Sequence, residues 1–147
     1  MNFNSQLNLK GQLSIKKYNS KNNLVQELNV PNLIVTVGKQ FIASRMIGTS
    51  SAVMSHMGIG TTATTPVAGN TTLANQIARV GDLAASVSGA IVTYSATFGP
   101  GVGTGSVVEA GIFNASSGGT MLCRTVFPVI NKDAGETIVI TWNISVG

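Results

Sequence analysis

The sequence is poor in the residues that build metal sites and disulfide frameworks. It contains one cysteine, Cys123, and one histidine, His56, among 147 residues. One cysteine cannot form a disulfide within the chain, and a structural zinc site needs several Cys or His ligands. The composition therefore excludes a disulfide scaffold and a typical zinc site, and it predicts no cofactor.

Targeting and membrane segments are also missing. The N-terminal sequence MNFNSQLNLK has neither the basic region nor the apolar region of a signal peptide. No apolar run approaches the roughly 20 residues that cross a bilayer as a helix. We expect neither secretion by the usual route nor a membrane partner.

Charged residues are scarce. They make up 10% of this chain, against about a quarter of an average soluble domain, whereas 44% of the residues are hydrophobic. Such a chain is long enough for a single β-sandwich domain with a core, which we place at residues 9–147 after a polar N-terminal arm at residues 1–8. The surface must consist largely of Ser, Thr, Asn and Gly, a composition that suits burial against neighbouring subunits.

The few charges are unevenly distributed. Residues 1–45 carry six basic residues and one acidic residue, for a net +5, whereas the remainder carries −1. A candidate basic contact surface comprises Lys10, Lys16, Lys17 and Lys21. Lysine contacts phosphates in nucleic-acid complexes, but the adjacent Lys16 and Lys17 face opposite sides of a strand. Contact with an acidic protein partner, or a solvated strand edge, is the better interpretation, and we expect no direct nucleic-acid partner.

Alternation of apolar and polar residues predicts several strands. Leu9, Gly11, Leu13 and Ile15 alternate with polar residues, and the alternation resumes, interrupted by Gln26, at residues 24–30, which predicts a hairpin that ends at Pro31. The same period at residues 136–146 places Trp142 in the core. Residues 61–72 have the composition of a long loop.

One segment has helical character. Residues 37–47 repeat apolar side chains at helical spacing, Thr36 can cap the first turn, and Gly48 can end the helix. A further helical turn is expected at residues 72–76. Together with about eight short strands, the pattern predicts a mainly β fold, an antiparallel β-sandwich or partly closed barrel with one short helix.

The most distinctive passage is VEAGIFNASSGGTMLCRTVF at residues 108–127, which predicts two strands joined by an Asn/Ser/Gly turn. Glu109 and Arg124 are charged residues within its apolar arms. They are expected to form a cross-strand ion pair or an intersubunit contact. Catalysis by Glu109 would need a second carboxylate nearby, and His56 has no catalytic partner in the sequence pattern. We therefore predict that the protein is not an enzyme.

Five segments together carry a family resemblance. They are NLIVTVGKQFIASRM at residues 32–46, MSHMGIGTT at 54–62, TTLANQIARV at 71–80, EAGIFNASSGGTMLCRTVF at 109–127 and ETIVITW at 136–142. In combination they resemble a family of small virion structural proteins of tailed bacteriophages, described as tail-fibre or appendage-associated proteins. The resemblance implies a β-rich virion domain and supplies no catalytic or ligand-binding residue.

Three functions remain open at this point. The resemblance favours a homo-oligomeric tail, fibre-base or adaptor subunit that contacts other virion proteins and is assembled in the host bacterial cytoplasm. The alternative is a capsid decoration or head-fibre protein bound to the major capsid protein. A host-glycan-binding module is the third, with Tyr18 as the aromatic side chain that would contact a sugar.

Overall fold

In the residues that it describes, 8–49 and 52–147, the computed structural model is an antiparallel sheet with one short helix. The strands are β1 (Leu9–Tyr18), β2 (Leu24–Ile34), β3 (His56–Gly60), β4 (Gln76–Val80), β5 (Ala84–Ser88), β6 (Ile91–Phe98), β7 (Gly105–Phe113), β8 (Met121–Lys132) and β9 (Thr137–Val146), and the helix is α1 (Thr36–Arg45). The predicted mainly β fold with one short helix is confirmed. The arm predicted at residues 1–8 lies, apart from Asn8, outside the described residues.

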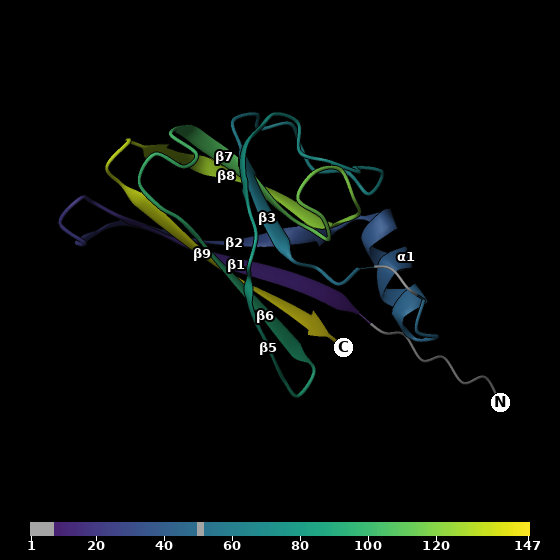
Figure 1. Cartoon of the computed structure of the whole chain (residues 1–147). Coiled ribbons are helices and arrows are strands. Elements are labelled where there is room, and N and C mark those ends of the chain that lie inside the picture. The colour runs from purple at the N-terminus through teal and green to yellow at the C-terminus, as the bar shows by residue number, and fades with distance from the viewer. Residues whose placement is uncertain (1–7, 50–51) are drawn as a thin grey trace.

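The nine strands are hydrogen-bonded in the order β4-β3-β7-β8-β2-β1-β9-β6-β5 and curl into a half-barrel (Figure 1). β2 pairs with β8 at two positions, Leu33 with Arg124 and Ile34 with Cys123. This narrow joint divides the sheet into a first half-sheet of β2, β1, β9, β6 and β5 and a second half-sheet of β8, β7, β3 and β4. Because both belong to one continuous sheet, the partly closed barrel is the better of the two predicted descriptions.

The inward faces of the two half-sheets share one core. In β9, alternation directs Ile138, Ile140, Trp142 and Ile144 inward, and each is at most 3% exposed. They belong to the same buried cluster as Ile112 of β7. Full burial of one large apolar side chain stabilises a fold by roughly 1.5–3 kcal/mol, so β9 does much to hold the half-sheets together. The predicted core position of Trp142 is confirmed.

The β1–β2 hairpin confirms the first predicted pair of strands but not the predicted end of the second. β2 continues through Pro31, which lies opposite Gln12, as far as Ile34. Proline is tolerated because β2 pairs with β8 only beyond this point. The missing N–H of Pro31 therefore leaves no hydrogen bond to β8 unmade. The carbonyl of Pro31 accepts a hydrogen bond from Thr125 Oγ1 at 2.8 Å. The expectation that Pro31 ends the strand is therefore wrong.

Helix α1 coincides closely with the predicted helix, but its predicted cap is wrong. Val35 occupies the N-cap position and makes no side-chain cap hydrogen bond. Thr36 is instead the first helical residue, and its backbone N–H donates to the carbonyl of Ala68 at 2.8 Å. A carbonyl that is remote in the sequence takes the place of a local side-chain cap.

The helix lies against β8 at a glycine. Gly38 is buried, and a Cβ at this position would collide with the backbone of Leu122. Glycine lowers helix propensity by about 1 kcal/mol relative to alanine, but here it permits the close approach of helix and strand. Packing on β8 thus compensates for a weak helical sequence.

Residues 61–75, called the long loop below, join β3 to β4 without a helix or strand. The loop predicted at residues 61–72 is confirmed. The helical turn expected at residues 72–76 is wrong, because the N–H groups of Ala74 and Asn75 donate to the carboxylate of Glu109. Contacts with β7 therefore set the conformation of this end of the loop.

Candidate functional site

Glu109 of β7 and Arg124 of β8 form a buried ion pair. Glu109 lies opposite Val126 and Arg124 opposite Gly111, so the two side chains meet diagonally across the hairpin. Arg124 Nη2 and Nε lie 2.9 Å and 3.1 Å from the same carboxylate oxygen, Oε2. Glu109 is 0% and Arg124 1% exposed. The structure brings together the two residues that the sequence singled out, and it buries both, so the surface of the chain does not present them to a neighbouring subunit.

The carboxylate of Glu109 also binds the C-terminal end of the long loop. Oε1 accepts the N–H of Asn75 at 2.7 Å, and Oε2 accepts the N–H of Ala74 at 3.0 Å. Gly60 lies opposite Glu109, where a Cβ would collide with Oε1 and with the carbonyl of Asn75. The absence of a side chain at Gly60 therefore allows the loop to reach the carboxylate.

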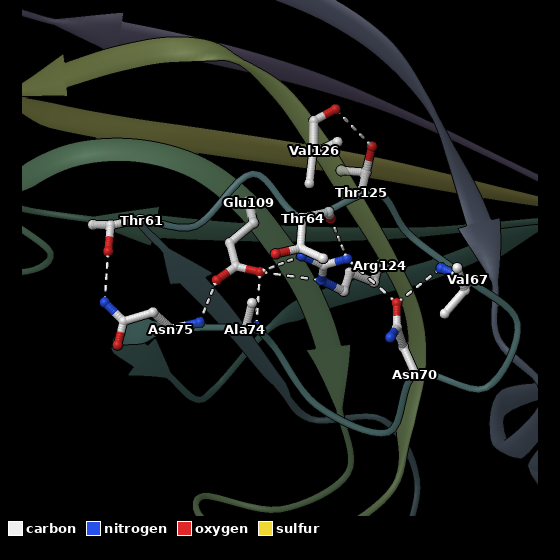
Figure 2. A network of polar contacts seen from close by, with 10 residues as sticks. All are labelled: Thr61, Thr64, Val67, Asn70, Ala74, Asn75, Glu109, Arg124, Thr125 and Val126. Carbon is white, nitrogen blue, oxygen red and sulfur yellow. Dashed lines mark hydrogen bonds and ion pairs between the residues drawn. The ribbon is translucent and has the colours of Figure 1, made fainter.

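The guanidinium of Arg124 binds the middle of the same loop. Nη1 donates to the carbonyl of Thr64 at 2.9 Å and to Oδ1 of Asn70 at 3.3 Å. That amide oxygen also accepts the N–H of Val67 at 2.9 Å. Figure 2 shows that the ion pair lies between the long loop and strands β7 and β8, which carry Glu109 and Arg124. Burial of charge is tolerated where a pair is close and its remaining groups are hydrogen-bonded, as they are here.

The ion pair fixes the loop and offers little to a substrate. A shallow hollow of about 360 Å³ beside Arg124 is lined by residues 69–74 and Thr64. The guanidinium already donates to a carboxylate, a carbonyl and an amide oxygen, so it presents no free cation to an anionic ligand. Glu109 is fully buried beneath the loop and cannot contact a bound molecule unless the loop opens. The geometry favours a structural role for both residues.

The four lysines of the candidate basic surface do not share one face. Lys10 and Lys16 point outward from the first half-sheet, and Lys21 lies in the exposed β1–β2 turn. Lys17 lies on the opposite face of β1, where Nζ donates to a backbone carbonyl of β8 at 2.9 Å and lies 3.6 Å from Glu136 Oε2. The structure therefore divides the set, and one of its charges already has a partner.

Lys132 is a buried cation that the sequence did not mark as important. It is 2% exposed, and Nζ donates to the carbonyl of Gly99 at 2.8 Å, which ties the glycine-rich β6–β7 loop to β8. Burial lowers the pKa of Lys132, and the nearby carboxylate of Glu136 opposes this shift. The sequence signal was the alternation that places Lys132 on the same face as Ile130.

Arg79 of β4 holds the tip of the β7–β8 hairpin. Nη1 donates to the carbonyls of Ala115 and Gly118 at 3.1 Å and 2.9 Å. The guanidinium lies 3.6 Å from the centre of the Phe113 ring, a favourable cation–π position. These contacts hold the Asn/Ser/Gly turn of the hairpin against β4.

His56 has a hydrogen-bonding neighbour that the sequence pattern did not reveal. Ser55 Oγ lies 2.7 Å from Nδ1 of His56. Nε2 faces Gly81, where an added Cβ would lie 2.8 Å away. In a nucleophile–base pair a third group usually orients the base, whereas here the second ring nitrogen faces the protein backbone. This contact fixes the imidazole at the start of β3.

Cys123 lies at the joint of the sheet, opposite Ile34, and is 0% exposed. Burial raises the pKa of the thiol well above its ordinary value of 9.0. A thiol that stays protonated is a poor nucleophile and a poor metal ligand. Cys123 is therefore a core residue at the place where the half-sheets meet.

The centre of the outward face of the first half-sheet is polar and uncharged, and Lys10, Lys16 and Glu27 lie at its border. Register aligns side chains across the strands in two rows, namely Asn29, Ser14, Thr141 and Ser95, and Gln12, Asn143, Thr93 and Ser86. These eight residues are called the polar face below. Thr93 Oγ1 donates to Asn143 Oδ1 at 2.8 Å. A concavity of about 590 Å³ next to it is lined by Lys10, Gln12 and Asn143 among others.

Within residues 8–49 and 52–147, no group of three or more His, Cys, Asp or Glu side chains is placed to bind a metal ion. No helix in the same residues is long and apolar enough to span a membrane.

Comparison of the chain with protein-family models, curated proteins and solved structures found no match.

Proposed function

We propose that this chain is a non-enzymatic structural protein of a tailed-bacteriophage virion, an oligomeric tail, fibre-base or adaptor subunit that acts through protein–protein contacts. The five sequence segments that resemble virion structural proteins support the virion assignment. The arrangement of polar groups supports a contact function.

The observation that carries the proposal is the polar face. It extends across β2, β1, β9, β6 and β5 and consists of hydroxyl and amide side chains, bordered by Lys10, Lys16 and Glu27. Neutral hydroxyl and amide groups lose less hydration free energy on burial than charged groups do, and each can form hydrogen bonds with a neighbouring protein. Such a face is suited to burial in an assembly.

The site residues support a contact function in a second way. The charged residues of the β7–β8 hairpin hold the long loop in place by hydrogen bonds, and Lys132 holds the β6–β7 loop in the same way. A subunit with fastened loops keeps its surface preorganised, and preorganisation reduces the entropy lost on association. The chain is therefore well built for repeated contacts with the same neighbours.

The test is incorporation into phage particles. Quantitative mass spectrometry of purified particles should detect the chain, and Asn143→Lys, which places a charge on the polar face, should reduce its copy number by about ten-fold or more. Thr71→Lys adds the same charge to an exposed position of the long loop and should leave incorporation unchanged. Absence of the wild-type chain from particles would refute the proposal.

Copy number also separates the two virion locations. A tail, fibre-base or adaptor subunit should be present in far fewer copies than the major capsid protein. A copy number comparable with that of the major capsid protein would instead identify a capsid decoration or head-fibre protein.

A further inference from the structure

Among the strands that the structure describes, β4 and β5 are the two edges of the sheet and pair with no further strand, and they differ in protection. The pairing of β4 with β3 is irregular between Ile59 and Gly60, and β4 carries the cation Arg79 and contacts β6. Irregular pairing and charge are the usual means of preventing an edge strand from pairing with another chain. The sequence of β5 is AASVS, and its pairing with β6 is regular throughout. It has no charge and no proline.

β5 is also the most exposed strand of the sheet. All five of its residues are exposed, and Val87 is 71% exposed. Figure 1 shows the β5–β6 hairpin at the bottom of the view, with β5 outermost and far from β7 and β8. An apolar side chain and a free backbone edge are therefore presented together to the surroundings.

The charge distribution favours a second copy of this chain as the occupant of the edge. The chain has a net charge of +4, so two copies repel unless they meet at a neutral surface. No charged residue occurs between Asp82 and Glu109, a stretch that includes the whole of β5 and β6. This hairpin is a place where two copies can approach without opposing like charges.

The backbone geometry defines how two β5 strands can pair. Gly89 and Ala90 form a two-residue turn with φ 57° at Gly89, and Ser88 and Ile91 close it. The closing pair of such a turn is hydrogen-bonded, so alternation along the strand directs the N–H and C=O groups of Ala85 and Val87 away from β6, toward the free edge.

The side chains of β5 are compatible with antiparallel pairing of two β5 strands. In an antiparallel pair centred on Ser86, Ala85 of each copy lies opposite Val87 of the other, and the two outward-facing serines at position 86 face each other. Val87 lies opposite Val92, and Ala85 opposite Tyr94, on the inward face of β6. Apolar contacts thus continue on one face and hydroxyl contacts on the other.

We propose that two copies of this chain associate through β5, antiparallel about a two-fold axis at Ser86, and so join their sheets edge to edge. The inference rests on the proposed function because it treats the chain as an assembly subunit, and it names the first partner in that assembly. β5 is then an intersubunit strand, and the polar face becomes continuous across two copies.

Cysteine cross-linking tests the register. Two residues directly opposite each other in a non-hydrogen-bonded pair have Cβ atoms about 4.5–5.5 Å apart, close to disulfide geometry. Ser86→Cys should therefore give a disulfide-linked dimer under mild oxidation. Ser88→Cys lies in the same exposed strand but about 13 Å from its symmetry mate, so it should cross-link at least ten-fold more slowly. Equal cross-linking of the two variants would overturn the proposed register.

Charge insertion tests the interface itself. Ser86→Lys places two like charges directly opposite each other and should raise the dimer dissociation constant about 100-fold or more. Val129→Lys, at an exposed valine of β8, adds the same charge and should leave association unchanged. Multi-angle light scattering of the purified chains measures both. A monomeric wild type, or a Ser86→Lys variant that remains dimeric, would refute the interface, whereas a trimer would point to a different symmetry and also refute it.

The two proposals fail independently. Dimerisation is measured on the purified chain alone, and virion incorporation is measured in particles. A chain that is monomeric in isolation yet present in particles refutes the β5 interface and leaves the virion function standing. A β5-linked dimer that is absent from particles refutes the function and leaves the interface standing.

Discussion

Two hairpins of the same sheet differ in charge and in burial. The β7–β8 hairpin contains Glu109 and Arg124, yet both side chains are buried beneath the long loop. The β5–β6 hairpin contains no charged residue, yet every residue of β5 is exposed. The charged pair of one hairpin thus lies inside the molecule, whereas the neutral strand β5 of the other lies at its surface. Burial in this chain depends on which distant segment covers a strand, and much less on the composition of the strand.

The comparison is tested most strongly by breaking the buried ion pair. Glu109→Gln leaves Arg124 charged and without its counter-ion, and we expect a loss of about 3–5 kcal/mol in the free energy of unfolding. Glu27→Gln removes an exposed carboxylate of β2 and should change stability by less than about 0.5 kcal/mol. Urea denaturation followed by tryptophan fluorescence measures both, since Trp142 is in the core. Equal effects of the two changes would show that the buried pair does not stabilise the hairpin.

The covering of the β7–β8 hairpin by the long loop can be tested at a glycine. Gly60→Ala inserts a methyl group against Glu109 and Asn75 and should destabilise the fold by about 1–3 kcal/mol. Gly69→Ala lies in the loop with no atom within 4 Å of the added Cβ, so it should change stability by less than about 0.5 kcal/mol. The loop should also become more accessible to protease in Gly60→Ala. Unchanged protease resistance of the loop in Gly60→Ala would contradict the close packing of Gly60 against Glu109 and Asn75.

Burial of the Cys123 thiol in β8 should make the free energy of unfolding depend on pH. Because burial raises the folded-state pKa of Cys123 above that of the unfolded chain, the protonated thiol stabilises the fold at neutral pH, and this contribution declines as the pH rises above the unfolded value. Between about pH 8 and pH 10 the wild type should lose about 1.4 kcal/mol relative to Cys123→Ala. The pH dependence of the midpoint of urea denaturation measures the difference. Parallel curves for the two proteins would mean that the thiol ionises equally in both states.

The smallest effect is expected at the exposed hairpin. Val87→Thr, measured in the Ser86→Lys background so that the chain stays monomeric, should change the free energy of unfolding by less than about 0.5 kcal/mol. Val107→Thr introduces a hydroxyl at a position of β7 that is 1% exposed and should cost about 1–3 kcal/mol. Thermal unfolding of both variants measures the contrast. A large loss at Val87 would mean that β5 is covered within the monomer.

Much of the local structure could be predicted from the sequence. Alternation in residues 136–146 predicted β9 and the inward position of Trp142, because side chains of a strand face opposite sides at every second residue. The turn residues at 114–119 predicted the β7–β8 hairpin, because glycine at positive φ, as at Gly118 and Gly119, is compatible with a tight turn.

The errors have one physical cause. Pro31, Thr36 and residues 72–76 were each interpreted from their neighbours in the sequence, and in each case a remote group decided the outcome. On the side that faces β8, β2 is not yet paired at Pro31. The Ala68 carbonyl accepts the N–H of Thr36, and Glu109 accepts the N–H groups at the end of the long loop. Hydrogen bonds of this kind depend on tertiary packing and leave no periodic signal.

The sequence by itself determined a mainly β chain with one short helix, a charged hairpin, a neutral hairpin and a basic N-terminal third. These features follow from residue order, since periodicity and turn chemistry act over a few neighbouring residues. The tertiary structure alone decided that the charged hairpin is covered, that Lys132 is buried, that the four lysines are divided between faces and that β5 is left as an open edge. The reason is that the curl of the sheet and the position of the long loop depend on contacts between segments far apart in the chain, and those contacts determine which polar groups are removed from water.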